Sequence, residues 1–167
     1  MVGRNLMEVA VKMAEGFQLI PLAEMRELSG IEVFRRLLDG RFPPAPIAQT
    51  LDFSLVEVEE GRVVFAGTPD LRHYNPLGTV HGGYIATLLD SAMACAVHTT
   101  LAAGLGYTSV EIKVNFVRPL TEKSGLVRAE GKVISVGRRV ATAEGYLIDG
   151  DGKLAAHGTT TCLIFPI

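Results

Sequence analysis

Cysteine is scarce in this chain, and charges of the two signs nearly cancel. Only Cys95 and Cys162 occur in 167 residues, without the C-x-x-C spacing that would indicate a zinc site or a redox pair. A reducing environment fits this usage, so we expect a cytoplasmic protein. The formal net charge of −2 provides no basic field to attract phosphates, and we therefore expect no nucleic-acid partner.

Long uninterrupted apolar runs are missing as well. Charged residues interrupt the first fifteen positions too often to leave the apolar core of a signal peptide, so we expect no export signal. The one stretch of membrane-span length, 83–104, contains Asp90 and His98. Because a central carboxylate costs about 2.5–3.5 kcal/mol on insertion, we predict a buried core helix there and no membrane partner.

Motifs of several other protein classes are also missing. The chain has no G-x-S-x-G, so a serine-hydrolase elbow is not supported. Gly152-Lys153 lacks the remaining residues of a phosphate-binding loop. The segment 149–153 resembles a calcium loop only faintly, since Thr160 stands where the last ligand should be a glutamate. The histidines lack metal-ligand spacing. We therefore expect no metal and no cofactor.

The hydrophobic pattern divides the chain into a helical first part and a second part rich in strands. Apolar spacing and capping signals predict short helices over 6–14, 21–28 and 31–38. A proline-rich segment, 41–46, then breaks the helical pattern. We predict an N-terminal helical extension over 1–48 and a main domain over 49–167.

Within the main domain, alternating apolar residues predict six strands around one long helix, 84–101. The strands are predicted as a hairpin over 50–68 and as 110–116, 125–136, 138–148 and 153–165. The helix is apolar nearly all round and should be buried, while small residues such as Ala129 and Gly131 let a curved sheet close on it. We therefore predict an α+β hotdog fold, in which a six-stranded, mostly antiparallel sheet wraps one long central helix.

Polar side chains form one stripe on this helix. By the i, i+3, i+4 rule the stripe comprises Thr87, Asp90, Ser91, Ala94 and His98. On an ordinary amphipathic helix such a stripe would face solvent. This helix is too apolar for the surface, so we predict that the stripe lines a cleft.

Gly82 and Gly83 open the helix directly after His81. Free N–H groups at such a start can bind an anion or polarise a carbonyl, although the glycines could equally serve a sharp turn alone. His81 and Asn75 are similarly open to structural or orienting roles. In combination, Asp90 near a carbonyl carbon and a Gly82 N–H for the oxyanion provide both halves of an acyl-transfer site.

The stretch NPLGTVHGG at 75–83, with Asp90 and the strand SVEIKVNFVRP at 109–119, resembles the hotdog acyl-CoA thioesterases of the phenylacetate pathway, the PaaI-like family. The resemblance covers about residues 49–165. It implies that Asp90 activates water or attacks the thioester directly. It also implies that Gly82 donates its N–H to the thioester oxygen.

The resemblance implies further site residues and an assembly. Asn75 and His81 would orient the thioester and the loop, and Ser109, with Thr108 beside it, would place the water. Family members are dimers or dimers of dimers whose sites are shared between subunits. Our candidates for substrate binding are Gly83 and, for CoA phosphates by charge and position alone, Arg118, Arg138 and Arg139. The alternative for the three arginines is that they are solvated charges at strand ends.

We predict a thioester hydrolase that converts an aryl- or medium-chain acyl-CoA to free acid and CoA, with CoA present only as part of the substrate. Asp90 would be its base or nucleophile. Two alternatives stay open. One is a non-catalytic acyl-CoA-binding module with the same fold, and the other is a thioesterase acting on acyl-carrier-protein thioesters.

Overall fold

Short helices occupy the first part of the chain. The computed structural model describes residues 16–167, and the helix predicted over 6–14 lies outside them. The described helices here are α2 (Leu22–Arg26), α3 (Gly30–Leu38) and α4 (Pro46–Thr50). Helix α3 begins where its capping signal predicts, because the Ser29 N–H donates to the Glu32 carboxylate at 3.2 Å. Helix α4 is absent from the prediction. Pro46 starts it, since a proline in the first helical turn loses no helical hydrogen bond.

Every strand pair in the described sheet is antiparallel, and the strand order is β1-β2-β4-β5-β6-β3. The strands are β1 (Phe53–Glu59), β2 (Arg62–Gly67), β3 (Leu105–Phe116), β4 (Val127–Val136), β5 (Val140–Ile148) and β6 (Leu154–Pro166). Three pairs join consecutive strands, whereas β2 with β4 and β3 with β6 join segments distant in sequence. The predicted six-stranded, mostly antiparallel sheet is confirmed.

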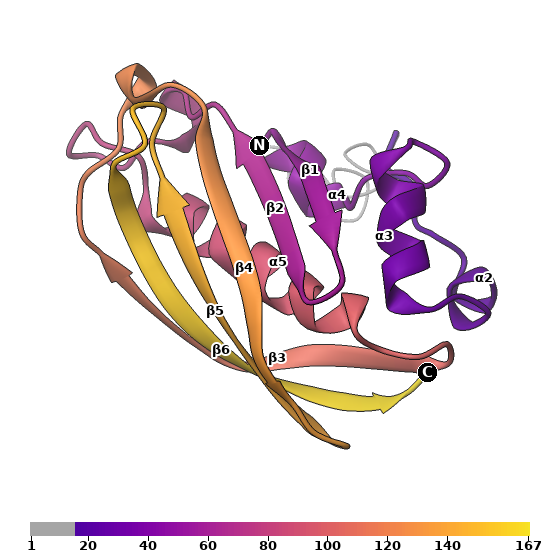
Figure 1. The fold of residues 1–167 in the computed structure, drawn as a ribbon. Helices are drawn as coiled ribbons and strands as arrows, with labels where there is room; N and C mark the ends of the chain where they lie inside the picture. Colours follow the sequence, from indigo (N-terminus) through magenta and orange to yellow (C-terminus); the bar gives the residue numbers. More distant parts are fainter. Residues whose placement is uncertain (1–15) are drawn as a thin grey trace, which may run out of the picture.

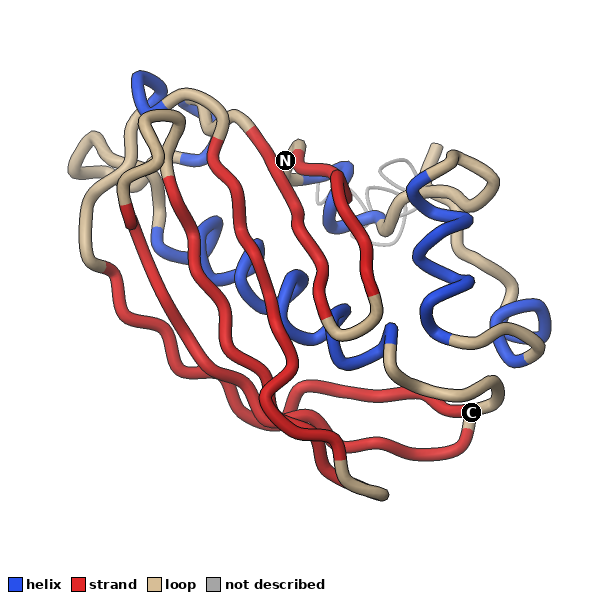
Figure 2. Tube along the Cα trace, in the orientation of Figure 1, coloured by secondary structure: helices blue, strands red, loops and turns tan. Residues whose placement is uncertain are grey.

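The long helix α5 (Gly82–Thr99) lies within the curve of this sheet (Figure 1 and Figure 2). Leu88, Leu89 and Met93 are fully buried, and each large apolar side chain buried in this way stabilises the fold by about 1.5–3 kcal/mol. Helix and sheet approach closely at Gly131 in β4, where a Cβ would lie 2.2 Å from the Ala92 backbone. The predicted hotdog arrangement is therefore confirmed. Among residues 16–167, no helix has the length and apolarity needed to cross a bilayer.

The N-terminal extension packs on the C-terminal end of α5. The Gly30 N–H donates to the Leu101 carbonyl at 2.9 Å, and the Phe34 ring meets the His98 ring edge to face. A Cβ at Gly30 would lie 1.7 Å from the His98 carbonyl oxygen, so only glycine allows this approach. Figure 1 shows α3 beside β1, at this end of the long helix. The extension thus contacts the end of α5 opposite to the one that starts at Gly82.

Candidate active site

The helix carboxylate Asp90 contacts the strand hydroxyl of Ser109. Ser109 Oγ donates a hydrogen bond to Asp90 Oδ1 at 2.8 Å, and both residues are half-buried. The pairing of β3 with β6 shifts register directly after Ser109, an irregularity of the kind that re-aims side chains beside functional sites. Within the described residues Asp90 Oδ2 has no hydrogen-bond partner. One carboxylate oxygen is therefore held by the protein, and the other is available to a ligand.

His81 caps the start of α5. Its Nδ1 accepts a hydrogen bond from the Gly83 N–H at 2.8 Å, so the neutral ring carries its proton on Nε2. The Gly82 N–H has no acceptor within residues 16–167, and it lies at the positive end of the helix dipole. A Cβ at Gly82 would lie 3.1 Å from Cζ of Phe116, so this aromatic ring borders the glycine. The helix start therefore leaves one backbone donor available.

The Asn75 side chain is used within its own turn. Its Nδ2 donates to Thr79 Oγ1 at 2.9 Å, and its Oδ1 accepts from the Leu77 N–H at 2.9 Å. Gly78 in the same turn has a φ of +84°, in the left-handed region that favours glycine. These contacts give Asn75 a role in shaping the loop that leads to His81. The orienting role toward a thioester stays a prediction.

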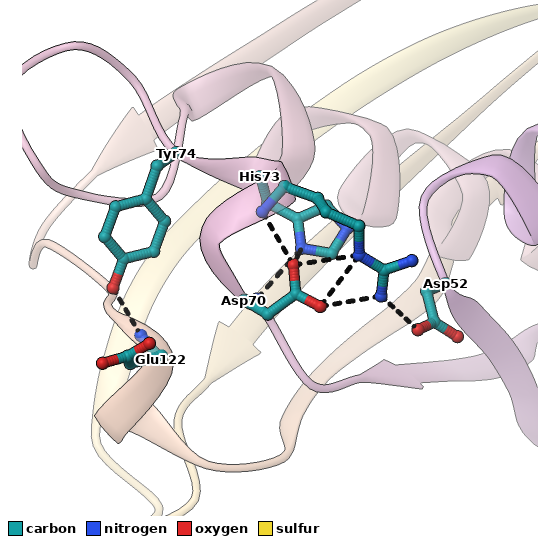
Figure 3. Close-up of polar contacts among 6 residues, drawn as sticks. Asp52, Asp70, His73, Tyr74 and Glu122 are labelled. Carbon is teal, nitrogen blue, oxygen red and sulfur yellow. Dashed lines mark hydrogen bonds and ion pairs between the residues drawn. The ribbon is translucent and has the colours of Figure 1, made fainter.

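A charged network that the sequence analysis missed holds the loop before α5 (Figure 3). Arg72 pairs with Asp70 at 2.7 Å and with Asp52 at 2.8 Å. The hydrogen bond from Arg72 holds the pKa of the Asp70 carboxyl below its usual range. The Asp70 N–H donates to His73 Nδ1 at 3.0 Å, and the His73 carbonyl accepts from the His81 N–H at 2.7 Å. The network thus anchors the residue that caps α5.

An open pocket of about 380 Å³ lies at the start of α5, lined in part by His81, Gly83, Tyr84 and Thr87. Thr87 Oγ1 donates to the Gly83 carbonyl at 2.8 Å, so this hydroxyl is bound to its own helix. The Tyr84 hydroxyl is buried and has no hydrogen-bond partner in the described part of the chain. Burial raises the pKa of Tyr84 to about 12, so its phenol is neutral at pH 7.

The residues of the predicted polar stripe become more buried toward the C-terminal end of α5. Thr87 borders the open pocket, and Asp90 and Ser91 are half-buried. Ala94 and His98 are buried, with 5% and 7% of their surface exposed. Burial lowers the pKa of His98 to about 4, so this imidazole is neutral at pH 7.

The remaining candidates for substrate binding lie on the surface. Thr108 is exposed, and it points to the opposite face of β3 from Ser109 because side chains alternate along a strand. Three arginines are also exposed, and none of them forms an ion pair or a side-chain hydrogen bond within residues 16–167. They are Arg118, Arg138 and Arg139. No contact in the described chain joins them to the Asp90–Ser109 pair.

Several known proteins are similar to this chain in sequence. Residues 77–156 match the model of the Thioesterase superfamily. A Saccharolobus solfataricus protein classed with the esterases is 32% identical over 110 residues, 66% of this chain and 76% of that protein. Human acyl-coenzyme A thioesterase 13 is 29% identical over 109 residues, 65% of this chain and 76% of that protein. A Caenorhabditis elegans protein, also classed with the esterases, is 33% identical over 66% of this chain, and the match spans only 65% of its own length.

Solved structures agree with the fold. The phenylacetic acid degradation-related protein of Ralstonia eutropha matches with a TM-score of 0.70 at 32% identity, covering 78% of this chain and 98% of that one. The PaaI protein of E. coli matches with a TM-score of 0.71 at 20% identity, over 82% and 96%, a likeness that supports the fold alone. The fold is therefore that of the hotdog thioesterases. The chain belongs to the thioesterase superfamily, and its resemblance to PaaI-like thioesterases is confirmed.

Proposed function

We propose that this protein hydrolyses the thioester of an aryl- or medium-chain acyl-CoA to a free acid and CoA. The observation that carries the proposal is the 2.8 Å hydrogen bond by which Ser109 holds the Asp90 carboxylate. The same helix begins with a Gly82 N–H that has no acceptor in the described chain. The family, and the name of the human relative, acyl-coenzyme A thioesterase 13, support acyl-CoA as the substrate.

Asp90 acts as the general base in this proposal. Because Ser109 holds Oδ1, Oδ2 accepts a proton from the water that attacks the thioester carbon. The carbonyl oxygen becomes an oxyanion, which a Gly82 N–H stabilises. When the tetrahedral intermediate collapses, the carbon–sulfur bond breaks and the CoA sulfur takes up the proton. Direct attack by Asp90 would instead form an acyl-enzyme anhydride, and ¹⁸O from water would then enter the Asp90 carboxylate during a single turnover.

Helix geometry supports a site shared between two copies of the chain. Gly82 and Asp90 are eight residues apart on α5, which places them about 12 Å apart along the helix axis. The reacting thioester must lie about 3 Å from both the oxyanion donor and the attacking water. A second copy whose helix start faces Asp90 would bring the two groups to one carbonyl. We infer a homodimer, or a dimer of dimers, in which Asp90 of one copy faces the helix start of the other.

Other residues have supporting roles in the proposal. His81 and Asn75 shape the loop that presents the thioester, and Gly83 keeps the helix start open to it. Thr108, exposed next to Ser109 on β3, stays our candidate for a further contact with the substrate. The exposed cations Arg118, Arg138 and Arg139 are our candidates for binding the CoA phosphates.

The test is Asp90→Asn, assayed by thiol release from phenylacetyl-CoA and octanoyl-CoA. We expect kcat to fall by at least about 10², the size of effect usually attached to a lost acid–base group. Asp151→Asn is the matched control. Asp151 is an exposed carboxylate in the turn before β6, and among residues 16–167 its side chain pairs only with Lys153, so its loss should leave kcat unchanged.

Three results would contradict the proposal. If Asp90→Asn hydrolyses both substrates as fast as the parent protein, the assignment of Asp90 is wrong. If the parent protein binds acyl-CoA in calorimetry without releasing thiol, the protein is a binding module. If only acyl-carrier-protein thioesters are cleaved, acyl-CoA is not the substrate.

A further inference from the structure

A partly enclosed cavity lies between the N-terminal extension and the hotdog domain. Its volume is about 570 Å³, within the range of pockets that bury most of a small ligand. Both parts of the chain line it, including Phe34, Leu37, Ala48, Cys95, His98 and Tyr107. We call this cavity the chamber. Three of these residues precede the segment 77–156 that matches the family model, so the extension builds one wall of the chamber.

The walls of the chamber, as far as residues 16–167 form them, carry no charge at neutral pH. No Asp, Glu, Lys or Arg is among the described residues that line it. The Cys95 thiol and the Tyr107 hydroxyl lie 3.6 Å apart and can hydrogen-bond to one another. Burial raises the pKa of Cys95 to about 12 and lowers that of His98 to about 4, so both side chains are neutral. Such a lining favours a hydrocarbon and rejects a phosphate or carboxylate.

The Asp90–Ser109 pair does not line the chamber, but it lies one helix–strand contact away from Cys95 and Tyr107, which do. Cys95 follows Asp90 by five residues on α5, a rise of about 7.5 Å. Tyr107 precedes Ser109 by two residues on β3, so both side chains point to the same face of the strand, toward the helix. The contacts Asp90–Ser109 and Cys95–Tyr107 are therefore successive contacts across one helix–strand interface. A group attached to a carbonyl near Asp90 would extend along this interface into the chamber.

We propose that the chamber receives the hydrocarbon part of the acyl group, and that α3 and α4 of the N-terminal extension determine which acyl groups fit. This inference rests on the proposed function, because it takes the thioester to lie beside Asp90. Substitution of Leu37 tests this inference most directly. Leu37 is a half-buried residue on α3 that lines the chamber, and it lies at a distance in sequence from the catalytic groups.

The experiment compares Leu37→Trp with Leu38→Trp in the full chain. Leu38 is the next residue on α3, is 45% exposed and does not line the chamber, so it controls for a bulky substitution on this helix. We expect Leu37→Trp to lower kcat/KM for octanoyl-CoA by about 10-fold or more while acetyl-CoA is turned over as before. Leu37→Ala should shift the preference toward longer chains. Leu38→Trp should match the parent protein for both substrates.

Binding of the non-hydrolysable thioethers S-octyl-CoA and S-ethyl-CoA, measured by calorimetry, separates this inference from the proposed function. If no acyl-CoA is hydrolysed, the proposed function fails. The chamber is still supported if Leu37→Trp weakens S-octyl-CoA binding and leaves S-ethyl-CoA binding unchanged. If Leu37→Trp and Leu37→Ala, shown by melting temperature to be folded, keep the parental chain-length preference in both measurements, the chamber is not the acyl site. If Leu37→Trp does not fold, the Leu37→Ala variant decides alone.

Discussion

Gly82 is the residue at which one hydrogen-bond donor can be removed with little change to the helix. The first position of α5 accepts proline because its N–H has no helical partner. His81 already has the extended backbone, φ −63° and ψ 136°, that suits a residue before proline. We therefore expect Gly82→Pro to keep α5 intact and to lower kcat by about 10²–10³, the usual loss for one oxyanion donor. Thiol release and circular dichroism measure the two effects.

Gly82→Ala is the matched control for this substitution. It keeps the N–H and adds only a Cβ, 3.1 Å from Cζ of Phe116. We expect a much smaller loss of kcat than for proline. Equal losses in the two variants would show that crowding against Phe116, and not the missing donor, is responsible.

His98 makes the stability of the fold depend on pH. Burial lowers its pKa to about 4, below the value of about 6.5 in an unfolded chain, so the unfolded state binds more protons between these values. The free energy of unfolding should therefore fall as the pH is lowered from 6.5 to 4, by an amount on the order of 3 kcal/mol. Above pH 6.5 this contribution is fully present. Urea denaturation at pH 7 and at pH 4.5 measures the change.

His98→Phe provides the comparison, because the ring packs among the aromatic rings of Phe34 and Tyr107. The variant should lose stability less steeply than the parent protein over the same pH range. Carboxylates contribute equally to both proteins and cancel in the difference. Parallel curves for the two proteins would show that His98 is not the group that titrates.

Single residues differ in how far the sequence reveals them. Asp90 and Ser109 were predicted together because a carboxylate on an apolar helix is conspicuous and the motif around it is specific, and the structure brings the two into contact. Arg72 was missed, since its pairing with Asp52 joins two positions that lie 20 residues apart and that no periodicity connects. The Asn-Pro pair indicated that Asn75 could have a structural role in a turn, and its side chain does form hydrogen bonds within that turn.

At the level of elements, the contact between α5 and β4 limits which residues the sheet can carry. A Cβ at Gly131 would lie 2.2 Å from the Ala92 backbone, which cannot move without displacing the helix. We expect Gly131→Ala to lower the free energy of unfolding by about 3 kcal/mol or more, the upper end of the range for overpacked cores. Urea denaturation of the two proteins measures this difference.

Gly106→Ala serves as the control in the same sheet. The three atoms nearest to its Cβ would all belong to side chains, with Cγ2 of Ile167 at 2.3 Å and Cε2 of Phe165 at 3.5 Å, and a side chain can adjust where the backbone of α5 cannot. We expect a change below about 1 kcal/mol. A loss as large as that for Gly131→Ala would mean that any added methyl in the sheet is costly, and that the close approach to α5 is not the cause.

Elements with a strong repeating pattern were predicted well, and those defined by a tertiary contact were not. The alternation in β3 and the apolar surface of α5 identify both elements from sequence alone. Helix α4 was missed because Pro46 also fits an irregular boundary, and its five residues are too few to show a period. The pairing of β3 with β6 could not be predicted from the sequence, because alternation indicates that a strand exists but does not identify its neighbour in the sheet.

For the whole molecule, the decisive prediction is that two inactive chains complement each other. Asp90→Asn removes the base and Gly82→Pro removes the oxyanion donor, so each homodimer should be inactive. In a mixed dimer with shared sites, one site carries both changes and the other carries neither. Random mixing of equal amounts should therefore restore about one quarter of the parental activity, and isolated mixed dimers should show about one half of it.

The mixed sample is prepared by co-expression with two affinity tags, and mixed dimers are isolated before the thiol-release assay. The control is co-expression of differently tagged Asp90→Asn chains, which should stay inactive. If purified mixed dimers show no activity, Gly82 and Asp90 serve the same site within one chain, and the proposed sharing is wrong.

The hydrogen bond between Gly30 and Leu101 bears on how the substrate selectivity of such a protein can evolve. It ties the N-terminal extension to the end of α5 that lies about 25 Å from Gly82, at 1.5 Å per residue. Reaction chemistry and substrate choice would then be encoded in different stretches of the chain that meet along one helix. An extension transplanted from another chain, provided that it keeps a glycine at position 30, would alter substrate selectivity without changing the catalytic residues.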